Sequence, residues 1–303
     1  MNNHKLLLRA LPDRTETNNN LQHVVVAWSF EPDTDGIRYL STKKYAHPEN
    51  KTKPAAGTII VRIHKKKFNN PEIDSAFAEA IAATHLINTK GENIFRVDVS
   101  KSQNPARDLI DIDLSSDLAV QLLRRNQEDL VQLKHNQQHF LIGHFDSPAA
   151  FLYGCNFDIH HKQLLEGNVE LDAISCKWVI KKLLCRTPLG SVQITHRAIA
   201  EYLSMPLNKE LSARGQIFRR PYDAVKCLLI GAREPVEDNN PHIKRLRDKI
   251  GLDAQSLFNP RRTTFVDLKI TGRLSDVYLL FGFRALYSTE TKQRLENSGF
   301  ITW

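Results

Sequence analysis

The sequence predicts an α+β protein with two domains, and its length, its apolar patterning and its charge asymmetry support this. The chain has 303 residues, enough for one large or two medium domains. β-rich apolar runs alternate with helical spacing in the first half, whereas the second half is mainly helical until a late hairpin pattern. Residues 1–150 have a net charge of +1 and residues 151–303 a net charge of +7. We therefore expect an α/β domain over residues 1–160 and a basic domain over residues 165–303.

The first half is predicted to contain a βαβ unit. Apolar, β-branched runs at residues 24–30, 58–63 and 95–99 predict strands. Between the last two, Asn70 is the expected N-cap of a helix and Pro71 its first residue. The inward face of this helix follows a spacing of three and four residues and is made of Ile73, Ala76, Phe77, Ala80 and Ile81. Strand, helix and strand over residues 58–99 leave room for a βαβ crossover.

Three further elements are expected before the basic domain. Leucines at helical spacing predict a helix over residues 116–135. Residues 140–142 and 150–153 are short apolar runs, and we interpret them as strands.

The basic domain is predicted to open with an amphipathic helix that is capped near Asp172 and ended by Pro188 and Gly190. Its apolar stripe consists of Cys176, Val179, Ile180, Leu183 and Leu184. Lysines and an arginine occupy the other side, so one face is expected in the core and the other in solvent.

A strand, two helices and a hairpin follow in the prediction. Residues 192–194 are extended, and Thr195 caps a helix over residues 196–204. A second helix runs from Pro221 to Gly231. Apolar runs at residues 265–270 and 277–283 predict a hairpin that turns at Thr271, Gly272 and Arg273.

The positive charge of the chain is concentrated in one segment. Residues 177–233 hold eleven basic and three acidic residues, a net +8 that equals the net charge of the whole chain. A local excess of this kind is the electrostatic footprint of a polyanion partner. The residues expected to bind nucleic acid are Lys177, Lys181, Lys182, Arg186, Arg197, Lys209, Arg214, Arg219, Arg220 and Lys226.

Helix, short strand, helix, turn, helix and a later hairpin form an order that resembles a winged helix-turn-helix. The resemblance covers residues 172–285 and implies a DNA-binding protein, with a helix in the major groove and basic side chains on phosphates. The expected partner is double-stranded DNA, and no cofactor is expected. An RNA-binding or scaffold subunit of a larger nucleoprotein complex is a further alternative.

Asp267 and Lys269 provide the alternative of an enzyme. They stand two apart in a predicted strand, which places them on one face. This spacing resembles metal-dependent nucleases of the PD-(D/E)xK type, in which the acid holds Mg²⁺ and the lysine polarises water or the scissile phosphate. Asp253 or Asp238 would then supply a second carboxylate. A charge pair on an exposed hairpin face explains the same residues without catalysis.

The remaining groups of aspartates and histidines are interpreted as structural. Asp111 and Asp113, with Asp108 nearby, fit a Mg²⁺ site less well than a position before the helix at Ser116. The histidine positions lack the converging spacing of metal ligands, so no metal site is predicted. The histidines and cysteine considered are His139, His144, His160, His161 and Cys155. Phosphate-loop and dinucleotide-binding glycine motifs are absent from the sequence.

The expected location is cytoplasmic. The first residues lack the apolar stretch of a signal peptide, and no run is long enough to span a membrane, so a membrane partner is not expected. The four scattered cysteines suit buried thiols in a reducing compartment. A homodimer or a larger complex is compatible with the N-terminal domain. Trp28, Trp178 and Trp303 fit core positions as well as they fit base-stacking positions.

Overall fold

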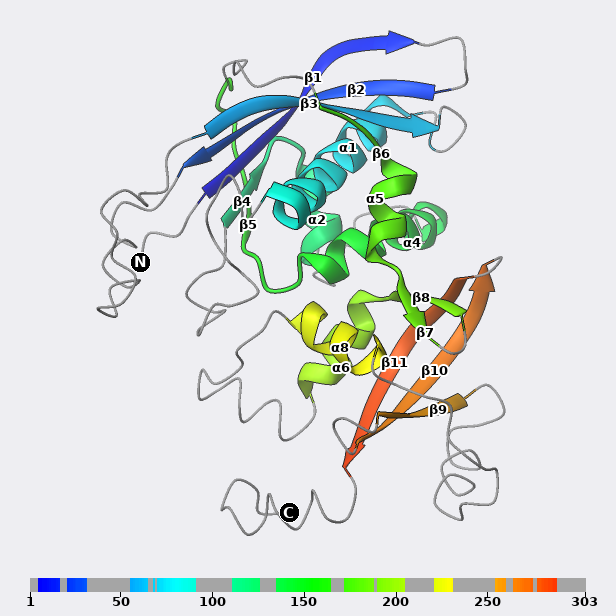
Figure 1. The fold of residues 1–303 in the computed structure, drawn as a ribbon. Helices are drawn as coiled ribbons and strands as arrows, with labels where there is room; N and C mark the ends of the chain where they lie inside the picture. The colour runs from blue at the N-terminus through cyan, green and yellow to red at the C-terminus, as the bar shows by residue number, and fades with distance from the viewer. Residues whose placement is uncertain are drawn as a thin grey trace, which may run out of the picture. The chain divides into compact units, whose positions relative to one another are not determined.

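The computed structural model describes most of the first half of the chain and the central strands and helices of the second half. The residues described are 5–16, 21–31, 55–64, 68, 70–90, 111–125, 135–164, 172–187, 190–204, 221–230, 254–259, 264–274 and 277–287. They belong to two compact units, Met1–Lys182 and Leu183–Trp303. Each unit combines a sheet with helices (Figure 1), which confirms the predicted α+β class.

The first unit is built on a six-stranded mixed sheet in the order β5-β4-β1-β2-β3-β6. Its strands are β1 (Lys5–Glu16), β2 (Leu21–Glu31), β3 (Ala55–His64), β4 (Asp111–Leu114), β5 (Phe157–Ile159) and β6 (Asp172–Ser175). β2 is antiparallel to its neighbours β1 and β3, while the pairs β1–β4, β4–β5 and β3–β6 are parallel. Among these six strands, β2 alone therefore runs against the rest.

The core of the first unit lies around β1, a strand that the sequence patterning did not predict. Leu6, Leu7 and Leu8 are fully buried. Because successive strand residues point to opposite faces, both faces of β1 are covered. Helix α1 (Pro71–His85) packs against β1, β2 and β3 (Figure 1).

Helix α1 begins as its sequence predicts. The Asn70 side-chain oxygen accepts hydrogen bonds from the backbone amides of Glu72 at 2.9 Å and Ile73 at 3.4 Å, and Pro71 occupies the first turn. The polar Thr84 interrupts the apolar face yet is fully buried, because its hydroxyl donates to the carbonyl oxygen of Ala80 at 2.8 Å. A short π-helical segment, η2 (Leu86–Lys90), continues α1.

The strand expected at residues 95–99 lies outside the described residues. Among the described residues, the strand that follows α1 and η2 is β4, and β4 pairs with β1 and β5 instead of β3. The crossover from β3 through α1 therefore passes two intervening strands of the sheet, β2 and β1.

Helix α2 (Asp117–Arg124) is shorter than the predicted helix over residues 116–135. Ser116 is its N-cap, with the hydroxyl oxygen accepting from the Ala119 amide at 3.3 Å. Arg125 ends the helix in the left-handed region, at a φ of 56°. A residue in this conformation cannot continue an α-helix, which explains the early end.

The two strands expected at residues 140–142 and 150–153 are wrong. The chain from His135 to Phe151 forms one helix, α4, and Leu141, Phe145 and Ala149 bury one face at a spacing of four residues. Pro148 lies within the helix, where it removes one backbone donor.

The expected cap at Asp172 is also wrong. Asp172 begins β6, which pairs in parallel with β3, and helix α5 (Cys176–Leu183) starts only after this strand. α5 ends before the predicted breakers Pro188 and Gly190, because β7 (Cys185–Thr187) follows it.

The second unit contains a five-stranded sheet in the order β7-β8-β11-β10-β9 and two helices. Its remaining elements are β8 (Gly190–Ile194), α6 (His196–Ser204), α8 (Pro221–Ile230), β9 (Ala254–Asn259), β10 (Thr264–Leu274) and β11 (Val277–Tyr287). The predicted strand before Thr195 and both helices are confirmed, and the Thr195 hydroxyl oxygen accepts from the Ala198 amide at 3.1 Å.

The predicted hairpin is present, with its turn in a different place. β10 and β11 are antiparallel neighbours, and β8 pairs in parallel with β11. Thr271, Gly272 and Arg273 lie inside β10 instead of forming the turn. The pairing register of β10 with β11 shifts between Lys269 and Ile270 and again between Ile270 and Gly272. The residues that resemble a turn signal therefore lie at or next to strand irregularities of the β-bulge kind.

All four cysteines of the chain are free thiols, and Cys176 and Cys185 are buried. Burial raises the pKa of the Cys185 thiol to about 11, against a smaller opposite effect of Lys226. A thiol of this kind is protonated and unreactive at neutral pH. Among the described residues, no helix is both long enough and apolar enough to cross a lipid bilayer.

Candidate nucleic-acid interface

Helix α5 is held in place by its apolar face. Cys176, Val179 and Leu183 are buried, with exposed fractions of 6%, 4% and 3%. This is the i, i+3, i+7 spacing of one helix face. The strand before the helix, β6, is hydrogen-bonded to β3, so the start of α5 is fixed to the sheet of the first unit.

The opposite face of α5 is basic and carries a large aromatic ring. Lys177, Lys181 and Lys182 are exposed, and Trp178 is 60% exposed. The Lys182 ammonium nitrogen lies 4.2 Å from the centroid of the Trp178 ring, which is within the range of a cation–π contact. Trp28, by contrast, is buried in the core at 1% exposure. The high exposure of Trp178 therefore comes from its position on the outer face of α5.

This face has no negative charge of its own. The sequence of α5 contains no acidic residue, and within the described part of the chain its three lysines form no ion pair. Three adjacent cations without a counter-charge repel one another and attract an anion. The arrangement therefore provides a positive surface next to an aromatic ring.

Three more predicted binding residues are described, and all three lie in the second unit. Arg186 is exposed on β7. Arg197 on α6 forms an ion pair with Glu201, with 3.0 Å between the guanidinium and carboxylate atoms. Lys226 on α8 is half-buried, and its ammonium nitrogen lies 5.9 Å from the Tyr222 ring centroid.

The predicted basic set is thus divided between the two units, since the three lysines of α5 belong to Met1–Lys182. The remaining predicted residues lie outside the described part of the chain: Lys209, Arg214, Arg219 and Arg220. Of the six that are described, the three α5 lysines are the ones that share a single helix face.

The nuclease candidates lie on the sheet of the second unit. Asp267 and Lys269 are both in β10, a strand with a neighbour on each side. Asp267 is paired in register with Arg284 on β11 and with Ser256 on β9. An acid opposite an arginine is the pattern expected of a cross-strand charge pair. Asp253 and Asp238, the suggested further carboxylates, lie outside the described residues.

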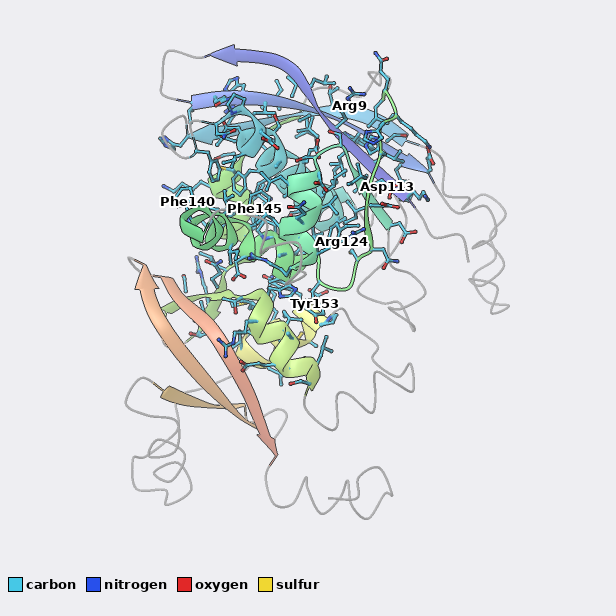
Figure 2. All side chains as sticks on the ribbon, turned by 180° about the vertical axis from the view of Figure 1, so that it is seen from behind. Arg9, Asp113, Arg124, Phe140, Phe145 and Tyr153 are labelled. Carbon is cyan, nitrogen blue, oxygen red and sulfur yellow. The ribbon has the colours of Figure 1, made fainter. Side chains whose placement is uncertain are left out.

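The aspartates of β4 have protein partners. The Asp113 carboxylate lies 3.6 Å from the Lys5 ammonium, and the Asp111 carboxylate accepts a hydrogen bond from the Asn156 side-chain nitrogen Nδ2 at 2.9 Å. Asp113 and Arg124 lie on the same side of the first unit (Figure 2). Asp108 is outside the described residues. The described part of the chain holds no cluster of three His, Cys, Asp or Glu side chains arranged for a metal ion.

The histidines also have structural surroundings. His144 packs edge-on against the rings of Phe68 and Phe140, with centroids 5.1 and 4.5 Å away, and Phe140 projects from α4 (Figure 2). His160 is buried, and its Nε2 atom lies 2.7 Å from the carbonyl oxygen of Leu8. His139 is on α4, His161 is exposed and Cys155 is half-buried.

Sequence reasoning missed a buried carboxylate that joins several segments of the first unit. Glu79 lies on α1 and is fully buried. Its carboxylate accepts hydrogen bonds from the amides of Ala10, Ser115 and Ser116 and from the Ser115 hydroxyl. Burial raises the pKa of this carboxyl above its ordinary value, and the hydrogen bonds oppose the rise. All four donors are protein groups, so Glu79 has a structural role.

Comparison with known proteins adds no relative. The chain matches no protein-family model, no curated protein and no solved structure.

Proposed function

We propose that this protein binds nucleic acid and that the exposed face of α5 is part of the binding surface. The observation that supports this most directly is the combination of Lys177, Lys181 and Lys182 with the 60% exposed Trp178 on one helix face. Lysines bind phosphate groups and release their counterions, which drives association at low salt.

The second unit is proposed to act as a winged-helix-like DNA-binding module. The order β8, α6, α8 and the β10–β11 hairpin supports the resemblance, as does the position of β11 between β8 and β10. The parallel pairing of β8 with β11 departs from that resemblance. Basic residues of this unit would contact the backbone of double-stranded DNA.

A titration of the full chain with labelled duplex DNA at increasing salt tests this proposal. If lysines neutralise phosphates, the logarithm of the binding constant falls linearly with the logarithm of the salt concentration. Absence of duplex binding at low salt, or an affinity that salt leaves unchanged, contradicts the proposal that the second unit binds double-stranded DNA.

Companion experiments test three alternatives. Preferential competition by RNA would indicate an RNA-binding subunit. Nicking of supercoiled plasmid in Mg²⁺ would indicate the nuclease, with Asp253, Asp267 and Lys269 as its candidate residues and Mg²⁺ as its metal. Binding to neither nucleic acid would leave the scaffold alternative.

A further inference from the structure

The indole ring of Trp178 is accessible to a ligand although the Lys182 ammonium group lies over one of its faces. Lys182 lies over the ring at 4.2 Å, yet the residue is 60% exposed. Trp178 and Lys182 are four residues apart and Trp178 and Lys181 three apart, so the three side chains are neighbours on one helix face. Much of the ring therefore remains available to a planar group that arrives next to two ammonium groups.

The chemistry of this surface selects among ligands. The three lysines of α5 favour an anionic ligand, because α5 itself has no acidic residue to neutralise them. The aromatic ring of Trp178 can stack on a flat, weakly polar group that lies beside the negative charge of the ligand. Single-stranded nucleic acid carries both at every nucleotide, because its bases are unpaired and its backbone is anionic. In a duplex the base faces are stacked on one another, so they reach the ring only after unstacking.

We propose that Trp178 stacks on an unpaired base of single-stranded nucleic acid while Lys177 and Lys181 contact the adjoining phosphates. This inference rests on the proposed function and narrows it, since it assigns single strands to α5. Lys182 stays over the ring and adds positive charge to the same face. Base stacking on an aromatic ring tolerates any base, so this site binds without sequence preference.

The test uses the full chain, an end-labelled oligothymidylate and a duplex of the same length. Trp178→Ala is expected to weaken binding of the oligothymidylate about tenfold, the usual order for one stacked base. Duplex affinity should change less than about twofold, because the substitution keeps every lysine. Trp178→Phe keeps an aromatic ring and should restore most of the single-strand affinity.

Indole fluorescence gives an independent readout. Oligothymidylate should quench the emission of the wild-type protein, and most of that quenching should disappear in Trp178→Phe. Thermal unfolding of each variant checks the fold, which an exposed position should leave unchanged.

The outcomes separate this inference from the proposed function. If neither the oligothymidylate nor the duplex binds the wild-type protein at low salt, both proposals fail. If both ligands bind and Trp178→Ala leaves the oligothymidylate affinity unchanged, nucleic-acid binding stands and the stacking site is wrong. Equal losses on single strand and duplex, or no recovery in Trp178→Phe, would also overturn the stacking site. A ring that serves a protein partner instead predicts unchanged affinity and no quenching by the oligothymidylate.

Discussion

Glu79 on α1 and Ser115 at the end of β4 are joined by two hydrogen bonds. The Ser115 hydroxyl donates to one carboxylate oxygen at 2.5 Å, and the Ser115 amide donates to the other at 3.1 Å. The same carboxylate accepts from the amides of Ser116 at 3.1 Å and Ala10 at 2.8 Å. Three segments that are distant in the sequence therefore meet at one buried side chain.

The Ala10 contact explains why a carboxylate is useful here. Ala10 is the last residue in register with β2 before the pairing of the two strands shifts. A shift of this kind leaves backbone groups without a partner in the sheet. Glu79 accepts a hydrogen bond from one of them, the Ala10 amide, and also from the amides of Ser115 and Ser116 just before α2.

Replacement of Glu79 by Gln should destabilise the protein by about 2–3 kcal/mol. The amide nitrogen of Gln cannot accept a hydrogen bond, so two of the four donors would lose their acceptor and would face another donor. Chemical denaturation of the purified variant measures the loss. Glu72→Gln is the matched control, because Glu72 lies exposed in the first turn of the same helix and should cost no more than about 0.5 kcal/mol. Similar values for the two variants would show that the buried hydrogen bonds contribute little.

The contribution of Glu79 to stability should decrease as pH rises. Burial raises the pKa of the folded carboxyl above that of the unfolded chain, so the folded state holds this proton more tightly. Stability from this group is complete below the unfolded pKa and is lost as pH rises through the folded pKa. We expect the free energy of unfolding of the wild type, relative to Glu79→Gln, to fall as pH increases above about 4.5. A difference that grows with pH would mean that the four hydrogen bonds hold the pKa below its ordinary value.

Asp146→Asn should destabilise the first unit more than removal of an exposed carboxylate. Asp146 on α4 lies 3.4 Å from Arg125, whose side chain is 6% exposed and also donates to the Ile142 carbonyl oxygen at 2.6 Å. Loss of the counter-charge leaves a buried guanidinium, at a cost of about 2–3 kcal/mol. Asp158→Asn is the control, since Asp158 is 80% exposed and 4.0 Å from Arg124, and a change below about 0.5 kcal/mol is expected. Equal unfolding midpoints for the two variants would contradict this view of Arg125.

The elements that the sequence predicted are those with local signals. The caps at Asn70 and Thr195 need partners within three residues, and both form as expected. β6 is held by pairing with β3, and the start of β1 pairs with β4 as well as with its sequence neighbour β2. The pairings with β3 and β4 join residues about a hundred positions apart, so short windows of sequence contain no signal for them. The strands expected within α4 failed because a short apolar run fits a strand as well as a turn of helix. The burial of Leu141 and Phe145, four residues apart on one helix face, depends on tertiary packing that such a short run does not reveal.

The residues of the candidate site can also be divided into those with a local sequence signal and those without one. The three lysines of α5 could be placed on an exposed face from spacing alone. The exposure of Trp178 had a signal too, because it stands off the apolar stripe between Lys177 and Lys181. Glu79 had no sequence signal, because a carboxylate on an alanine-rich helix is ordinarily exposed. Its role as a hydrogen-bond acceptor depends on Ala10 and Ser115, which are distant in the sequence.

Replacement of Lys177 and Lys181 by Ala should weaken nucleic-acid binding and reduce its salt dependence. If both ammonium groups contact phosphates, the slope of the logarithm of affinity against the logarithm of salt should fall by about two. The control is Lys5→Ala with Lys162→Ala, which removes two exposed lysines that are paired with Asp113 and Glu31 in the same unit. Equal slopes in the two double variants would place the contacts elsewhere in the chain.

Asp267→Ala separates a binding protein from a nuclease. Asp267 is paired in register with Arg284 on β11 and stands two residues from Lys269 on β10. If the acid and the arginine serve as a cross-strand pair, the wild type should leave supercoiled plasmid intact with Mg²⁺ or Mn²⁺, and the substitution should cost at most about 1 kcal/mol. We expect this result, because an acid in register with an arginine on the neighbouring strand is the pattern of a cross-strand charge pair. Metal-dependent nicking that Asp267→Ala abolishes, with DNA binding retained, would instead identify Asp267 as a metal ligand, since its loss removes the charge that positions the metal and its water.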